Sequence, residues 1–182
     1  MSVTQHKPED LFPNFDFDEF EKYIKDNILS KDPSIRIARD NRGEKSKNIY
    51  KDCKEHNRAV NADFYFLNPQ GNFAPQINRL RHSLLTYYAD CQAELRNTIW
   101  YKKNGYMGWH TNKYQTGDRV YLIWSEEDEK SSFDYYEKGK KKSILAPKGF
   151  SVNTFYCGEF ERMFAHQVTS DCNRISIGFR LR

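Results

Sequence analysis

The chain lacks any long hydrophobic run. No stretch of about 18 consecutive apolar residues occurs, so we predict no membrane-spanning helix. The first fifteen residues (MSVTQHKPEDLFPNF) contain no apolar region, so we expect no secretory signal. Internal repeats and low-complexity segments are missing too. What is present, 38% hydrophobic and 15% aromatic residues in a chain of 182, is typical of a globular protein.

Paired cysteine motifs are also absent. The four cysteines form no Cys-x-x-Cys pair and show no regular spacing, which speaks against a zinc cluster or a disulfide framework. They are Cys53, Cys91, Cys157 and Cys172. With no sign of export, we predict reduced thiols in a cytoplasmic protein.

Charge of one sign is not in large excess. The net charge is +4, and part of it lies in the run from Lys138 to Lys142, which we interpret as a solvated hairpin turn. A nucleic-acid partner is compatible with this charge but not indicated by it, because nucleic-acid binders usually gather positive charge on one face.

The N-terminal part, residues 1–97, is expected to be a helical support region. In residues 16–29 apolar side chains recur at helical spacing, which predicts an amphipathic helix. Residues 31–58 are charged and poor in apolar side chains, so we interpret them as a connection with a short strand at 35–38.

A second helix is predicted from Pro75 to about Arg96. Proline suits a first helical turn, and the apolar positions of the segment form one stripe. That stripe consists of Ile77, Leu80, Leu84, Leu85, Tyr88 and Leu95.

From residue 98 onward the hydrophobic period changes to two. Short alternating segments are separated by turn signals such as Asn104-Gly105 and Gly139, which predicts strands. The segments are 98–102, 106–113, 119–125, 131–137, 142–146, 150–156, 161–169 and 173–181. We therefore predict one mainly β domain over residues 1–182, in which 98–182 form a double-stranded β-helix (jelly-roll) barrel braced by the helices.

The last predicted strand alternates strictly. Arg174, Ser176, Gly178 and Arg180 share one face, and apolar side chains occupy the other. In an ordinary half-exposed strand the polar face contacts water, whereas in a barrel with a working interior it can face inward. Alternation alone leaves both arrangements open.

Two histidines on different predicted strands suggest a metal site. His110 and Asn112 are two residues apart on one strand and so share a face, and His166 lies on a later strand. Two histidines with an oxygen donor two positions after the first form a facial triad, which leaves three positions of an octahedral metal open.

An anion-binding group follows the second histidine. Arg174 comes eight residues after His166, and a guanidinium there can pair with the far carboxylate of a dicarboxylic acid, with Ser176 adding a hydroxyl donor. A single strand histidine is usually structural, and an arginine near the C-terminus is usually solvated. The joint spacing of all these residues favours the metal site.

This pattern resembles that of the 2-oxoglutarate- and iron(II)-dependent oxygenases, which is His-x-Asp/Glu, a distal His, then an Arg or Lys. The resemblance covers residues 98–182. The chain is similar to AlkB-type enzymes in two respects. Tyr101 lies nine residues before His110, and Arg174 and Arg180 match the Arg-x5-Arg of those enzymes. Prolyl-hydroxylase-like enzymes and small phage or bacterial oxygenases share the compact spacing of the second histidine and the arginine.

The resemblance implies Fe(II), 2-oxoglutarate and O2 as cofactor and cosubstrates. Fe(II) would be held by His110, Asn112 and His166, and Tyr101 would join Arg174 and Ser176 in binding 2-oxoglutarate. The implied reaction is hydroxylation of a C–H bond with decarboxylation of 2-oxoglutarate to succinate. If the chain were encoded by a phage, its location would be the host cytoplasm.

Asn112 departs from the family pattern, because it stands where the family has a carboxylate ligand. An amide oxygen is a neutral and weaker donor. Three hypotheses follow: Asn112 coordinates and the enzyme hydroxylates with looser metal binding; Asn112 swings away and an anion takes its place, as in halogenases; or the site is degenerate and the barrel only binds. Asp118 and Glu126 lack the spacing to replace it.

The substrate is not identified by the sequence. Aromatic residues near the metal strands, among them Trp109 and Tyr121, could line a cleft for a flat or ring-shaped group, or could simply fill the barrel. Small molecules, peptides and nucleobases remain equally suitable. Arg180 is a candidate for a second contact to an anionic group of the substrate, although a salt bridge explains it equally well.

The rival function is that of a jelly-roll binding protein without turnover. A metal-dependent hydrolase is a weaker alternative, because no general base lies beside the histidines.

Overall fold

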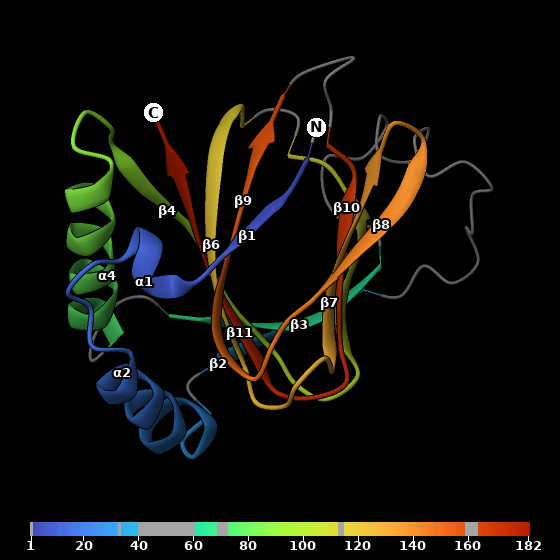
Figure 1. Ribbon diagram of the computed structural model, residues 1–182. Coiled ribbons are helices and arrows are strands. Elements are labelled where there is room, and N and C mark those ends of the chain that lie inside the picture. The colour runs from blue at the N-terminus through green and yellow to red at the C-terminus, as the bar shows by residue number, and fades with distance from the viewer. Residues whose placement is uncertain (1, 33, 40–60, 69–72, 113–114, 159–163) are drawn as a thin grey trace.

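Eleven β-strands dominate the chain in a computed structural model (Figure 1), which describes residues 2–32, 34–39, 61–68, 73–112, 115–158 and 164–182. The strands are β1 (Thr4–His6), β2 (Ser34–Arg39), β3 (Ala62–Leu67), β4 (Ala93–Tyr101), β5 (Gly105–His110), β6 (Gly117–Ser125), β7 (Ser131–Glu137), β8 (Lys140–Leu145), β9 (Gly149–Cys157), β10 (His166–Ser170) and β11 (Arg174–Leu181). The helices are α1 (Pro8–Leu11), α2 (Phe17–Tyr23), the π-helical η1 (Ile24–Leu29) and α4 (Ala74–Tyr87).

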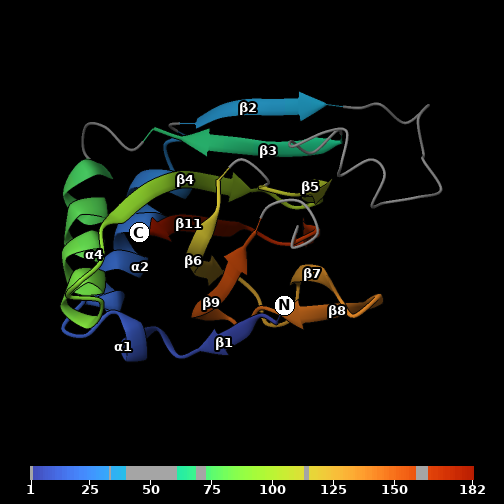
Figure 2. The same cartoon turned by 90° about the horizontal axis from the view of Figure 1, so that it is seen from above.

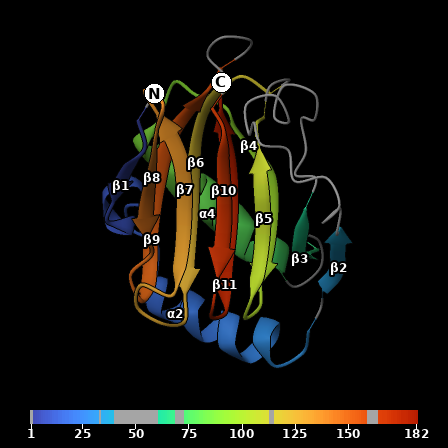
Figure 3. The same cartoon turned by 90° about the vertical axis from the view of Figure 1, so that its right-hand side faces the viewer.

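The strands form one antiparallel sheet that folds back on itself. Their order is β1-β9-β6-β11-β4-β3-β5-β10-β7-β8, with β2 paired to β3. Because β3 pairs with both β4 and β5, it connects the two facing layers. The helices cover the outer face of the layer that contains β4, β11 and β6 (Figures 1 and 2), while β5, β10 and β7 form the opposite wall (Figure 3). This arrangement confirms the predicted jelly-roll fold with bracing helices.

The two faces of β11 answer the question that its alternation left open. Ile175, Ile177, Phe179 and Leu181 belong to the apolar cluster that packs under the helices. Consequently Arg174, Ser176, Gly178 and Arg180 face the interior between the layers, and all eight residues of the strand are buried. The polar face of the last strand is therefore an inward face.

Two separate apolar clusters hold the layers together. The outer cluster joins the helices to the sheet, with Phe20, Ile24, Leu80 and Leu84 packed against side chains such as Trp100. The inner cluster lies between the two layers and is rich in aromatic rings: Phe64, Tyr101, Tyr121, Phe133, Tyr135, Phe155 and Phe164. The inner cluster surrounds the residues predicted to carry function.

The N-terminal part is less helical than expected. The predicted helix over 16–29 begins with Asp16, whose carboxylate accepts a hydrogen bond from the backbone N–H of Glu19 at 2.8 Å, and it ends as the π-helix η1. The short strand predicted at 35–38 is confirmed as β2. However, β1 and β3 also arise within residues 1–97, so describing this region as helical support was too simple.

The second helix is shorter at its C-terminal end than predicted. Helix α4 ends at Tyr87, and residues from Ala93 onward form β4, which pairs with β11 along its whole length. The sequence Ala93–Arg96 has good helix formers, but the pairing of the strand outweighs this local preference.

Each of the eight segments predicted as strands after residue 98 contains a strand, although 161–163 lie outside the described residues and β10 begins at His166. Their turns behave as expected: Asn104 has a φ of +63°, and Lys138 and Gly139 have φ of +51° and +76° in the tight β7–β8 hairpin. Cys91, Cys157 and Cys172 are free thiols, while Cys53 lies outside the described residues. No helix in the described part of the chain has the length and apolar character needed to cross a membrane.

Candidate active site

His110 and His166 face each other across neighbouring strands. They are direct partners in the β5–β10 register, and their ring centroids lie 4.1 Å apart. The Nδ1 of His110 is 2.8 Å from the carbonyl oxygen of Gly108, and the Nδ1 of His166 is 3.0 Å from that of Phe164. With Nδ1–H donated to a carbonyl, Nε2 of each ring keeps its lone pair, and that of His166 is buried without a hydrogen-bond partner.

The surroundings favour the neutral form of both rings. Burial lowers the pKa of His110, and burial together with the nearby His110 holds the pKa of His166 well below its ordinary value. A neutral imidazole is the form that binds metal ions. The pair is therefore preset as two nitrogen donors.

Asn112 lies two residues beyond the end of β5, rather than within the strand as expected. Its side chain lines the same cavity as the two histidines, and its Nδ2 donates to the sulfur of Cys157 at 3.8 Å. This contact uses the nitrogen end of the amide and leaves the oxygen end available. Among the residues the structure describes, no three His, Cys, Asp or Glu side chains are grouped to hold a metal ion.

The two acids considered as replacements for Asn112 lie elsewhere. Neither Asp118 nor Glu126 lines the cavity of the histidine pair. Glu126 instead accepts a hydrogen bond from the side chain of Asn173 at 2.9 Å. Neither acid is therefore placed beside the two histidines.

Arg174 is a buried guanidinium with one nitrogen unused. It is 1% exposed; its Nε donates to Ser176 Oγ at 3.2 Å, and its Nη1 donates to the Ser132 carbonyl at 3.2 Å and to Ser131 Oγ at 3.4 Å. Its Nη2 is buried without a partner. Burial lowers the pKa of Arg174 to about 10, so the group is still a cation at neutral pH. A carboxylate would satisfy both the charge and the unused donor.

Arg174 and His166 lie in different layers although only eight residues separate them in the sequence. The two residues are on consecutive strands of the chain, but β10 and β11 pair with different neighbours and lie in opposite layers. Arg174 spans the interior, as its bonds to β7 in the opposite layer show.

Tyr101 is the direct partner of Arg174 in the β4–β11 register. The Arg174 guanidinium carbon lies 5.8 Å from the centre of its ring. Burial raises the pKa of Tyr101 above its ordinary value, so the phenol keeps its proton and can act as a donor. Ser176 is two residues further along β11, and both Tyr101 and Ser176 line the histidine cavity.

That cavity measures about 400 Å³, within the range of small-molecule sites. It opens between the layers beside the histidine pair, and aromatic, amide and arginine side chains surround it. Its walls consist of Arg39, Phe64, Phe66, Arg96, Asn97, Ile99, Tyr101, Met107, His110, Asn112, Gln115, Arg119, Tyr121, His166, Val168 and Ser176.

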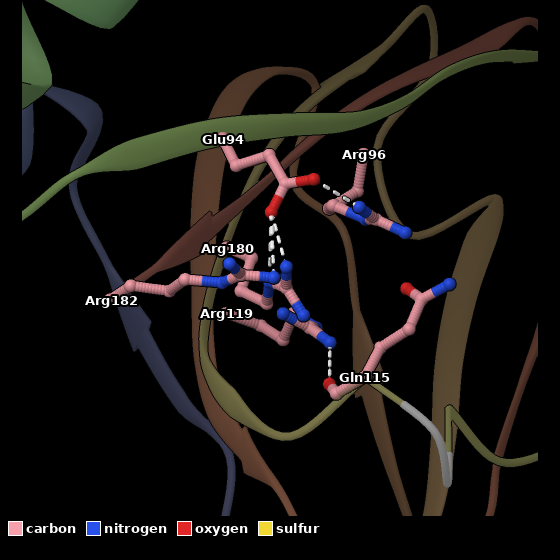
Figure 4. Close-up of polar contacts among 6 residues, drawn as sticks. All are labelled: Glu94, Arg96, Gln115, Arg119, Arg180 and Arg182. Atoms are coloured by element: carbon pink, nitrogen blue, oxygen red, sulfur yellow. Dashed lines mark hydrogen bonds and ion pairs between the residues drawn. The ribbon is translucent and has the colours of Figure 1, made fainter.

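The three residues suggested as substrate contacts have different environments. Tyr121 lines the cavity, whereas Trp109 does not and packs against the ring of Tyr136 at 5.0 Å. Arg180 is ion-paired with Glu94, through its Nε at 3.0 Å, which matches the salt-bridge alternative (Figure 4).

Arg119 and Arg96 line the cavity and were not singled out in the sequence. The signal for Arg119 was present, because it precedes Tyr121 by two residues on a strand and therefore shares its face. No comparable signal marks Arg96, whose orientation depends on an irregularity in the pairing of β4.

Comparison with known proteins identifies the fold. No protein-family model matches the chain, and no curated protein matches its sequence. Among solved structures, it is similar to a 2OG-Fe(II) oxygenase family oxidoreductase from Burkholderia pseudomallei (TM-score 0.62, 10% identity, covering 98% of this chain and 84% of the other). It is also similar to a prolyl hydroxylase from Trichoplax adhaerens solved with a hypoxia-inducible-factor peptide (TM-score 0.60, 10% identity, covering 98% of this chain and 82% of the other). A third similar structure is a prolyl-4-hydroxylase from Pseudomonas putida (TM-score 0.53, 12% identity, covering 99% of this chain and 92% of the other). At these identities the likeness shows a shared fold.

Proposed function

We propose that this chain is an Fe(II)- and 2-oxoglutarate-dependent oxygenase that hydroxylates a C–H bond. The observation that carries the proposal is the buried, unpartnered Nε2 of His166 beside His110, in a barrel that also buries the unpartnered Nη2 of Arg174. Leaving such groups without partners costs free energy in a folded protein, so their joint presence in one interior points to ligands. The fold shared with 2OG-Fe(II) oxygenases supports the same conclusion.

The donor set fits a ferrous ion. Two neutral imidazoles and one amide oxygen, from His110, His166 and Asn112, would occupy three positions and leave the others for cosubstrate and oxygen. When bound, the iron and 2-oxoglutarate would activate O2, which is the oxidant: one oxygen atom would enter succinate as CO2 is released, and the other would hydroxylate the C–H bond.

The residues around the metal position have separate tasks. Arg174 would bind the far carboxylate of 2-oxoglutarate through its free Nη2, and Ser176 holds the Nε of that guanidinium in place. Tyr101 would add a hydrogen bond to the same carboxylate. The aromatic inner cluster excludes water, so these charged contacts act in a medium of low dielectric.

Asn112 sets the strength of metal binding. The neutral amide removes one negative charge from the ligand set, so the site should bind iron more loosely than a site with a carboxylate ligand. Asn112→Asp is then expected to tighten binding by at least the roughly tenfold that even outer-shell changes produce. An open position filled by chloride would favour the halogenase-like variant, and failure to bind metal at all would favour a binding module.

Metal binding tests the proposal. Equilibrium dialysis with Fe(II) under anaerobic conditions, or with Mn(II) followed by electron paramagnetic resonance, should give one ion per chain. His166→Ala should abolish this binding. The matched control His82→Ala, at an exposed position on α4, should leave it unchanged. Equal binding by the two variants would place the metal elsewhere and overturn the proposal, and added chloride that strengthens binding would identify the halogenase-like arrangement.

A further inference from the structure

The cavity beside the histidines has a strongly positive wall. Arg39, Arg96 and Arg119 line it, and no Asp or Glu among the described residues does. Asn112 is neutral, and the carboxylate of Glu94 offsets part of the charge of Arg96 without lining this space itself. Such a cavity concentrates anions.

Arg119 is the best defined of these groups. It lies on β6, is 1% exposed, and donates from Nη2 to the backbone carbonyl of Gln115. Its Nη1 is buried and has no hydrogen-bond partner. Among the described residues no carboxylate pairs with it. A buried guanidinium with an unused donor in a cavity wall is a site prepared for an anion.

The only carboxylate in this cluster of described residues is already shared. Glu94 pairs with Arg96 and Arg180, and also with Arg182 at 3.5 Å. Figure 4 shows the guanidinium groups of Arg96, Arg180 and Arg182 close to Glu94, while the drawn contact of Arg119 goes to Gln115. One carboxylate therefore neutralises only part of the charge of three arginines. Of the arginines in this cluster, Arg96 and Arg119 line the cavity and make its wall positive.

A local irregularity turns Arg96 toward the cavity. In the β4–β11 pairing, Gly178 is opposite Asn97 and Phe179 is opposite Leu95, so Arg96 is an extra residue in β4. A bulge of this kind redirects a side chain that regular alternation would send to the other face. The Nε of Arg96 is also buried without a hydrogen-bond partner.

We propose that Arg119 and Arg96 bind the anionic group of the substrate, which is a small organic acid carrying a carboxylate or a phosphate. The apolar part of that acid would lie against Phe64 and Tyr121, which line the same cavity as the histidines. The volume of about 400 Å³ suits a small molecule. This inference rests on the proposed function for calling the ligand a substrate, but the binding site itself does not require a metal.

Binding of simple aromatic acids to the metal-free protein tests the inference. Benzoate and phenyl phosphate supply the two anionic groups, and benzamide is a neutral match for benzoate. Calorimetric titration of the wild-type chain should show binding of at least one acid and at least about tenfold weaker binding of benzamide, because a charge-assisted contact is lost. The acid that binds more tightly shows whether the site prefers a carboxylate or a phosphate. Equal affinity for benzoate and benzamide would overturn the inference.

Matched arginine variants locate the site. Arg119→Gln should weaken binding of the preferred acid by at least about tenfold, and Arg119→Lys should keep part of it, because the charge remains. Arg174→Gln, which removes the buried arginine at the other end of β11, should change the affinity for the preferred acid by less than about twofold while weakening 2-oxoglutarate binding. Loss of acid binding in Arg174→Gln but not in Arg119→Gln would contradict the inference. If Arg119→Gln does not fold, as judged by circular dichroism, Arg96→Gln must show the loss instead, and unchanged binding there would be equally contradictory.

Failure of this inference is distinguishable from failure of the proposed function. Acid binding is measured without iron, whereas the function is tested by metal binding at the histidines. A chain that binds iron but no acid would retain the oxygenase proposal and lose the substrate class.

Discussion

The two faces of β11 differ in chemistry although their residues alternate along one strand. The outer face contributes Ile175, Ile177 and Phe179 to an apolar cluster under the helices. The inner face presents Ser176 to the cavity of the histidine pair, and it buries Arg174, whose Nη2 has no hydrogen-bond partner. The outer face therefore contributes stability, and the inner face gives up stability to keep ligand sites open. Changes on the two faces should separate stability from binding.

The largest effect is expected on the outer face. Ile177→Ala removes a buried side chain between sheet and helices, and should lower the free energy of unfolding by about 2–5 kcal/mol. Urea unfolding measures this loss. Below the unfolding transition, the affinity for 2-oxoglutarate should remain at the wild-type value; a parallel loss of affinity would show that the two faces are not independent.

A substitution on the inner face should weaken ligand binding more than it lowers stability. Arg174→Gln removes the cation with the free Nη2, and should weaken 2-oxoglutarate binding to the iron-loaded protein by roughly 10- to 100-fold. The free energy of unfolding should change by no more than about 1 kcal/mol, because the loss of the hydrogen bonds to Ser131, Ser132 and Ser176 is offset by removal of a buried charge that has no anionic partner in the described structure. The control is Arg36→Gln, which breaks an exposed ion pair with Asp63 and should leave affinity unchanged.

Gly178 tests how tightly the inner face is filled. A Cβ at this position would lie 2.6 Å from Cε1 of Tyr121 and 2.6 Å from Oδ1 of Asn97. Gly178→Ala should therefore displace the tyrosine ring from the cavity wall and cost about 1–3 kcal/mol of stability. Thermal unfolding measures the cost. A variant as stable as the wild type, with unchanged acid binding, would show that the cavity wall around Gly178 accommodates a methyl group without displacement of Tyr121.

A smaller effect is expected from pH. His110 and His166 have a folded-state pKa below the ordinary value of 6.5, so below that pH the unfolded metal-free chain takes up more protons than the folded one. Stability should be constant with respect to these groups above about pH 6.5 and fall as the pH drops below it. Urea unfolding of the metal-free protein from pH 8 to 5 measures the slope, and the double variant His110→Gln/His166→Gln should flatten it. An unchanged slope in that variant would assign the dependence to other groups.

Local patterns in the sequence predicted much of the fold. Strict alternation located the strands after residue 98, and Asn104-Gly105 and Gly139 marked their turns. β3 escaped prediction, because its role depends on pairing with both β4 and β5, which are distant in sequence. The overlong second helix has the same origin, since pairing with β11 decides where β4 begins.

The candidate site was predictable where spacing carries the information. The positions of His110, His166 and Arg174 suggested a metal and an anion site, and the structure places the two histidines side by side. Arg119 was missed because its importance comes from a missing partner, and Arg96 because a bulge reorients it. Both depend on tertiary structure, which no local pattern contains.

Anaerobic titration with Fe(II) and 2-oxoglutarate tests the central claim most directly. When 2-oxoglutarate binds ferrous iron through two oxygens, a metal-to-ligand charge-transfer absorption is expected in the visible range. The wild-type chain should develop this band, and Arg174→Gln should need a higher 2-oxoglutarate concentration to reach the same intensity. Absence of the band in a wild-type sample shown to contain bound iron would contradict the assignment of this cavity as a 2-oxoglutarate oxygenase site.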